Sequence, residues 1–210
     1  KRGRPTTKRE IDLSKVLEIA VKEFADNGFG GAHLKEIAKK SGIANSMLSY
    51  HFDNKEDLWK QSVMQLGQKL QDRFIEIDSY FKDLEGMAAL KAYTRQFIYF
   101  SAEYPEFYKI VFHEMCTKTA RADWIIESVL APLHQFFKKN SDETKGKQLS
   151  MNGLPIANLL SISVGAANVF FIHAYHLEKM YGVNPFEKEE IEKHADIVIE
   201  LLFKNFDTKI

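Results

Sequence analysis

The sequence contains a single cysteine and no uninterrupted run of about 20 apolar residues. One cysteine, Cys116, excludes an internal disulfide and is typical of a reducing compartment. The missing apolar run argues against a membrane-spanning helix. No hydrophobic segment follows the basic start KRGRP, so this start does not resemble a secretory signal. These absences favour a cytoplasmic protein that does not enter a membrane.

The motifs of common enzymes are missing as well. The sequence has no phosphate-cradling glycine loop and no nucleophile motif. Two spacings, His113 to Cys116 and His173 to His176, could place metal ligands on one helix face, but neither comes with a full ligand set. We therefore expect no catalysis, no cofactor and no metal, and turnover of an aromatic substrate would contradict this.

The formal net charge is zero over 210 residues, but the charge is distributed unevenly. Residues 1–52 carry ten basic and six acidic side chains, a formal charge of +4, which leaves −4 on residues 53–210. A basic N-terminal part and an acidic remainder are expected if only the N-terminal part contacts phosphate groups. The arm includes Arg2-Gly3-Arg4-Pro5, which is similar to an AT-hook core that enters an A·T-rich minor groove. Diffuse attraction of a basic tail to DNA explains the same residues equally well.

Residues 28–58 carry the most informative pattern. Leu34, Ile37 and Ala38 recur at helical spacing and give a short helix one apolar face. Gly42 then breaks the pattern, because glycine takes the positive φ that turns one helix sharply onto the next. The spacing predicts a helix–turn–helix.

The second short helix, over residues 44–50, offers a polar surface. Its buriable side chains are Met47 and Leu48. The other face is nearly uncharged and both donates and accepts hydrogen bonds through Asn45, Ser46, Ser49 and Tyr50. Base edges in the major groove require such groups. A plain helical hairpin in a bundle is the alternative, but the basic arm and the flanking helices favour a DNA reader.

Residues 12–58 resemble the TetR family of transcriptional repressors. The resemblance lies in residues 16–20, 24–29, 34–38, 41–43, 48, 50–52 and 54–58. It implies an all-α fold of about nine helices in two domains. Residues 1–54 would form the basic arm and a three-helix helix-turn-helix DNA-binding domain, and residues 55–210 a helical domain for ligand binding and dimerisation.

The resemblance, the polar face and the basic arm together supply the candidate DNA contacts: Arg2, Arg4, His33, Ala44, Asn45, Ser46, Ser49, Tyr50, His51 and Lys55. Lys55 is expected at a phosphate. The sequence departs from the family at Ala32, where a capping hydroxyl is usual and His33 is the nearest polar residue. It departs again at Ser49, usually a tyrosine, and at Met47, usually a smaller residue.

Caps and helical spacing predict the remaining elements. Asp12 caps the first helix and Gly28 ends it, while Asn54 or Asp53 caps the fourth. Further helices are expected over 86–103, 106–115, 120–139, 154–181 and 186–206. A kink is considered at Pro132, a surface loop is expected over 140–153, and no strand is expected.

The last two helices suit a dimer interface. Residues 161–168 are mostly small, which lets helices approach closely, and the final helix adds a row of aliphatic residues. The candidate interface residues are Ser161, Gly165, Ala166, Ile197 and Leu201. The same residues could simply pack the core of one subunit, but a two-fold operator needs two DNA-binding heads and favours the homodimer.

The middle helices are rich in aromatic residues with a few polar groups among them, as small-molecule sites are. The candidate pocket residues are Tyr93, Phe97, Phe100, Tyr108, Phe112, Cys116, Trp124, Asn168 and Phe171. An aromatic core without a ligand is the alternative.

These features predict a ligand-responsive DNA-binding transcriptional regulator. The favoured form is a repressor that leaves a palindromic DNA operator when a small apolar or aromatic effector binds the C-terminal domain. The alternatives are an activator and a ligand-independent DNA-binding protein that uses its basic arm. A pure interaction module would bind no DNA.

Overall fold

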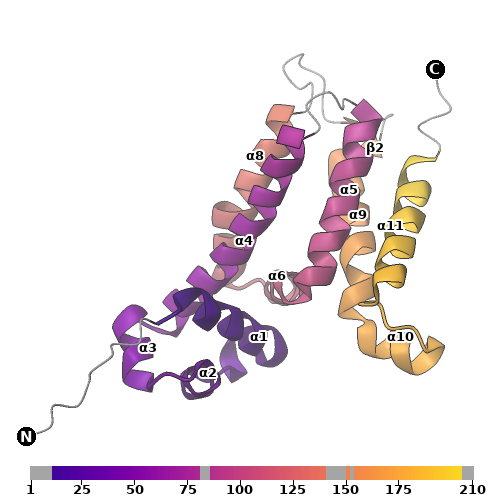
Figure 1. Ribbon diagram of the computed structural model, residues 1–210. Coiled ribbons are helices and arrows are strands. Elements are labelled where there is room, and N and C mark those ends of the chain that lie inside the picture. The colour runs from indigo at the N-terminus through magenta and orange to yellow at the C-terminus, as the bar shows by residue number, and fades with distance from the viewer. Residues whose placement is uncertain (1–10, 81–85, 141–149, 152–153, 205–210) are drawn as a thin grey trace, which may run out of the picture. The chain divides into compact units, whose positions relative to one another are not determined.

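The computed structural model describes residues 11–80, 86–140, 150–151 and 154–204, and helices dominate it (Figure 1). The helices are α1 (Leu13–Gly31), α2 (Leu34–Ser41), α3 (Asn45–His51), α4 (Lys55–Tyr80), α5 (Gly86–Glu103), α6 (Pro105–Thr117), α7 (Ala120–Ile125), the π-helix η1 (Ile126–Leu130), α8 (Ala131–Asn140), α9 (Ile156–Ile172), α10 (Ala174–Tyr181) and α11 (Lys188–Phe203). The all-α class is confirmed. The arm at residues 1–10, with Arg2 and Arg4, lies outside the described residues.

The contacts divide the chain into two compact units, Lys1–Gln65 and Leu66–Ile210. The helix α4 contributes residues to both. We refer to them below as the N-terminal unit and the C-terminal unit.

Local chemistry sets the ends of α1. The Asp12 carboxylate caps its start by accepting a hydrogen bond from the Lys15 N–H at 3.2 Å, as expected. The helix was expected to end at Gly28, but Gly28 interrupts α1 without ending it. Gly28 leaves the helical region with φ 68° and ψ 170°, but helical hydrogen bonding resumes and runs on to Gly31. A glycine tolerates this positive φ, so it kinks the helix without stopping it.

The turn between α2 and α3 follows the sequence pattern. Gly42 has φ 69° and ψ 26°, and its N–H donates to the carbonyls of Ala38 and Lys39. This left-handed residue satisfies the last carbonyls of α2 and redirects the chain. Ile37 and Ala38 are buried on α2, and Leu48 is buried on α3. These buried apolar side chains therefore hold the inner sides of α2 and α3 in the core of the N-terminal unit.

Three aromatic rings join the end of α1 to the start of α4. Phe24 stacks on Phe29 with ring centroids 6.1 Å apart, and Phe29 meets the edge of Trp59 at 6.3 Å. The start of α4 is capped by Asn54, whose Oδ1 accepts the Asp57 N–H at 2.9 Å. Of the two caps that the sequence allowed, Asn54 is the one used.

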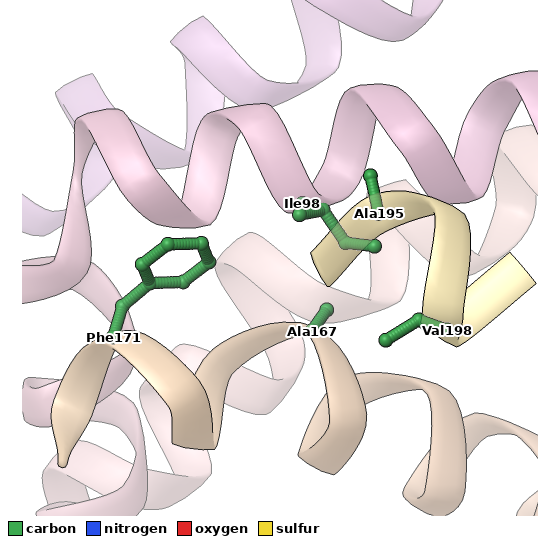
Figure 2. Close-up of a cluster of buried hydrophobic side chains, with 5 residues drawn as sticks. All are labelled: Ile98, Ala167, Phe171, Ala195 and Val198. Carbon is green, nitrogen blue, oxygen red and sulfur yellow. The ribbon is translucent and has the colours of Figure 1, made fainter. Parts of the chain in front are cut away.

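In the C-terminal unit, α9 and α11 pack against α5 (Figure 2). The shared core consists of Ile98 from α5, Ala167 and Phe171 from α9, and Ala195 and Val198 from α11, none more than 4% exposed. The small residues Ala167 and Ala195 let the helices approach, and the larger side chains fill the space between them. Each helix therefore buries one face and leaves the opposite face for other contacts.

Two helices that the sequence predicts as continuous are interrupted. The segment 120–139 contains η1 between α7 and α8, and η1 ends two residues before Pro132. Proline lacks an N–H and clashes with the carbonyl four residues earlier, so regular α-helical hydrogen bonding cannot run through this point. Within the predicted helix 154–181, His173 leaves helical geometry with φ −90° and ψ 16°, and the helix axis bends by 63°.

The expectation of no strand is also wrong in detail. β1 (Ser150–Met151) and β2 (Leu154–Pro155) form a two-residue antiparallel ladder. Most of the expected loop over 140–153 lies outside the described residues. The ladder is too short to change the fold class.

Candidate nucleic-acid interface and effector region

The helix α3 is held on one side and free on the other. Leu48 is 1% exposed and anchors it, whereas the predicted readers Asn45, Ser46, Ser49 and Tyr50 are all exposed. Tyr50 is the extreme case at 83%. One seven-residue helix thus presents hydroxyl and amide groups on a surface supported by a buried leucine.

Two local contacts order this surface. The Ser49 hydroxyl donates to the Asn45 carbonyl at 3.2 Å, so its oxygen can still accept a hydrogen bond from a partner. The Tyr50 and His51 rings meet edge to face at 5.2 Å. His51 is half-buried and Tyr50 projects, so His51 supports one side of the tyrosine ring.

The sequence pattern predicts Met47 on the buried side of α3 together with Leu48, and for Met47 this is wrong. Met47 is 40% exposed. Met47 lies about 100° around the helix from Leu48, which is 1% exposed, and this rotation leaves Met47 partly open to solvent. The deeper position belongs to Leu48.

The start of α2 forms a shallow hollow beside the start of α3. Its lining consists of His33, Leu34, Lys35, Glu36 and Asn45. His33 occupies the N-cap position of α2, but its side chain makes no capping hydrogen bond. The first amides of a helix attract anions, so a phosphate oxygen could bind here without a capping hydroxyl.

The two remaining predicted contacts near α3 have other local roles. Ala44 is exposed and occupies the N-cap position of α3. The Lys55 ammonium donates to the Gly30 carbonyl at 3.2 Å and lies 4.9 Å from the centre of the Phe29 ring. An ammonium has three N–H donors, so these contacts orient Lys55 and still permit a phosphate contact.

The pairing of Lys40 with the buried Glu23 in the N-terminal unit is not among the features predicted from the sequence. Glu23 on α1 is 5% exposed, and its carboxylate accepts hydrogen bonds from Lys40 at 2.5 Å and Asn27 at 3.1 Å. The hydrogen bond to Glu23 raises the pKa of the Lys40 ammonium. Because Lys40 lies in the last turn of α2, this pair joins the helix before the turn to α1. The signal in the sequence was the position of Glu23 among the apolar residues that α1 buries, because a buried carboxylate needs a partner.

The predicted effector residues lie in a network of aromatic rings in the C-terminal unit. The ring centroid of Tyr108 lies 5.5 Å from that of Phe97 and 5.9 Å from that of Phe112. The ring centroids of Phe74 and Tyr93 are 5.8 Å apart. Phe100, Tyr108 and Phe171 are buried. Burial raises the pKa of the Tyr108 hydroxyl well above its ordinary value, so this group is a neutral hydrogen-bond donor.

The other predicted effector residues differ in their surroundings. Asn168 is buried, but its amide donates to the Val164 carbonyl within α9 at 2.9 Å. Trp124 is half-buried, and Cys116 is exposed on α6. Of this group, the buried aromatic residues match an apolar site best.

The helices α9 and α11 each carry exposed apolar side chains. Ile162 is 55% exposed and Val169 41% on α9, while Ile197 is 47% and Leu201 77% exposed on α11. These positions alternate with the buried Ala167 and Val198 of Figure 2. Of the other predicted interface residues, Ser161 is exposed, Gly165 leaves open space around its Cα, and Ala166 is half-buried.

The described residues contain no group of three or more histidine, cysteine or acidic side chains arranged for a metal ion. The rings of His173 and His176 lie 6.4 Å apart at the bend between α9 and α10. No single helix among these residues has the length and hydropathy to cross a membrane.

Sequence comparison matches the part of the chain that forms this surface. Residues 16–61 match the model of the bacterial regulatory proteins of the tetR family. The HTH-type transcriptional regulator RutR of Escherichia coli is 30% identical over 100 residues, 48% of this chain and 46% of RutR. IcaR of Staphylococcus epidermidis, an HTH-type negative transcriptional regulator of the biofilm operon icaADBC, is 37% identical over 49 residues, 23% of this chain and 26% of IcaR. The chain thus spans less than half the length of these curated relatives.

Solved structures of similar fold cover nearly the whole chain. The fatty acid degradation regulator FadR from Bacillus halodurans has a TM-score of 0.64 at 18% identity and covers 91% of this chain and 97% of its own. The transcriptional regulator FadR from Bacillus subtilis, in complex with stearoyl-CoA, has a TM-score of 0.59 at 15% identity, with coverage of 91% and 97%. At these identities the likeness establishes the fold.

Proposed function

We propose that this chain is a ligand-responsive transcriptional repressor of the TetR family, whose model matches residues 16–61. The observation that carries the proposal is α3, a helix anchored by one buried leucine with exposed hydrogen-bonding groups on its outer side. Such a helix enters the major groove, where hydroxyl and amide groups distinguish base pairs.

Each surface residue has an assigned part in this proposal. Asn45, Ser46 and Tyr50 read base edges, and Ser49 accepts a hydrogen bond from a base or bridging water. The amides at the start of α2, with His33, hold one phosphate, and Lys55 holds another. Arg2 and Arg4 of the arm add attraction to the backbone. Phosphate contacts give affinity and salt dependence, whereas base contacts give sequence specificity.

Two copies of the chain would form the active repressor. The apolar outer faces of α9 and α11 associate with the same faces of a second copy, which makes a four-helix interface. Two recognition helices would then read half-sites about one DNA turn apart, roughly 34–36 Å. The operator is therefore a palindrome.

The effector is a small apolar or aromatic molecule that binds among the buried rings around Tyr108. The Tyr108 hydroxyl can donate a hydrogen bond to a polar atom of such a ligand. The FadR structure from Bacillus subtilis contains stearoyl-CoA, so long-chain acyl-CoA esters belong among the first effectors to test. Release requires that the ligand prefer the arrangement that does not bind DNA.

Selection of genomic DNA fragments with the purified protein, at near-physiological salt, tests the proposal. One enriched palindrome near a promoter supports it, and loss of binding on addition of one effector class identifies the inducer. Broad protection of A·T-rich DNA without a palindrome would instead favour binding through the arm. Enrichment that increases with effector would favour an activator or a co-repressed form.

A further inference from the structure

Met47 is an apolar side chain on the otherwise polar outer surface of α3. It lies about 100° around the helix from the buried Leu48 and about 60° from Tyr50. It is 40% exposed, so part of its side chain remains open to a partner. It therefore lies on the same surface as the proposed reading residues.

The position of this apolar group is unusual within the N-terminal unit. Among the described residues up to Gln65, the exposed large hydrophobic side chains are Leu13, Met47, Tyr50 and Met64. Two of the four lie on α3, which has seven residues. An exposed apolar side chain on a binding helix makes binding more favourable when the partner covers it and removes it from water.

The major groove contains one such apolar group, the 5-methyl of thymine. Methionine suits this contact because it is unbranched, flexible and polarizable. We propose that Met47 contacts a thymine methyl group and thereby selects thymine at one position of each operator half-site. This inference rests on the proposed function, since it adds an apolar reading element to the polar contacts of Asn45 and Ser46.

The test removes single methyl groups from the DNA. In the DNA site selected by the wild-type protein, each thymine is replaced in turn by deoxyuridine, which keeps every base-pairing group. Binding is measured for the wild-type protein, Met47→Ala and Met64→Ala. Met64 is a matched control because it is 37% exposed but lies on α4.

The wild-type protein is expected to lose about fourfold in affinity at one thymine of each half-site, the value of one buried methyl group. Met47→Ala should bind thymine and deoxyuridine equally at that position, while Met64→Ala keeps the wild-type difference. Circular dichroism confirms that both variants are folded.

Two results would overturn the inference while leaving the proposed function intact. The first is a selected site at which no deoxyuridine substitution weakens wild-type binding. The second is a uniform loss by Met47→Ala on all sites, which would mean that Met47 only supports the Tyr50 ring. If the wild-type protein selects no DNA sequence, the proposed function and this inference both fail.

Discussion

The Lys40 ammonium donates a hydrogen bond to the buried Glu23 carboxylate at 2.5 Å, and this pair joins α2 to α1. Glu23 also accepts from Asn27, so its carboxylate is well satisfied while Lys40 is present. The contact lies directly before the Gly42 turn. This ion pair therefore helps to orient α2, the helix before the turn, relative to α1.

Replacing Lys40 is expected to destabilise the N-terminal unit. Lys40→Met leaves a buried carboxylate without its cationic partner, which costs more than losing an exposed ion pair. The urea midpoint should fall for Lys40→Met. It should change little for Lys39→Met, whose Nζ is 3.9 Å from Glu36 and whose side chain is 78% exposed. Equal midpoints for all three proteins would contradict this role.

The same pair makes a prediction about pH. The pKa of Lys40 is raised in the folded protein above its ordinary value of 10.5, mainly by the hydrogen bond to Glu23. The stabilisation of the folded protein by this pair is therefore fully present below pH 10.5 and is lost as the pH rises through the pKa of Lys40 in the folded protein. The difference in stability between wild type and Lys40→Met should be constant from pH 7 to 9 and shrink above about pH 10.5.

The close approach of α4 to η1 depends on a glycine in the C-terminal unit. A Cβ atom added to Gly67 would lie 2.5 Å from Cγ1 of Val129. Gly67→Ala should lower the free energy of unfolding by about 1–3 kcal/mol, the usual cost of overpacking. The double variant Gly67→Ala with Val129→Ala should recover part of this loss in urea denaturation. Additive effects of the two changes would rule out the clash.

His194 is expected to make the C-terminal unit sensitive to acid. Desolvation lowers its pKa and outweighs the hydrogen bond that Nε2 donates to the Ala166 carbonyl. Below pH 6.5 the His194 side chain takes up a proton in the unfolded chain but not in the folded protein. The folded protein therefore becomes less stable as the pH falls from 6.5 towards the lowered pKa of His194. The drop in urea midpoint from pH 7.5 to 5.5 should be smaller in His194→Gln and unchanged in His134→Gln, whose imidazole is exposed.

A charge on the outer face of α11 should separate the proposed dimer. Ile197→Glu places a carboxylate in an apolar interface, and sedimentation should show a shift from dimer to monomer. Ile75→Glu is a matched control because Ile75 and Ile197 are both 47% exposed and Ile75 lies on α4. If Ile197→Glu stays dimeric, the interface lies elsewhere.

The features predicted correctly from the sequence are those that local chemistry determines. Asp12 and Asn54 cap helices because their carboxylate and amide oxygens reach N–H groups three residues later. Gly42 turns the chain because it alone in that segment tolerates a positive φ at no steric cost. The start of α5 at Gly86 and of α6 at Pro105 follow in the same way.

The features missed depend on residues far apart in the chain. Glu23 and Lys40 are 17 residues apart, and Gly67 meets Val129 across two helices. Met47 was misplaced because a seven-residue helix with two adjacent apolar residues has no repeat from which to choose the inner one. The proposed effector site could not be predicted residue by residue, since buried aromatic rings fill a protein core as readily as they line a ligand pocket.

The central claim is tested most directly by measuring the affinity of the selected DNA for Asn45→Ala, Ser46→Ala and Tyr50→Ala. Each variant removes one hydrogen-bonding group from α3 and should bind the selected site about 5- to 100-fold more weakly, with little change for unrelated DNA. Gln68→Ala, an exposed change on α4, should bind as the wild type does. Wild-type affinity and sequence preference in all three α3 variants would contradict the assignment of this helix as the reader of DNA.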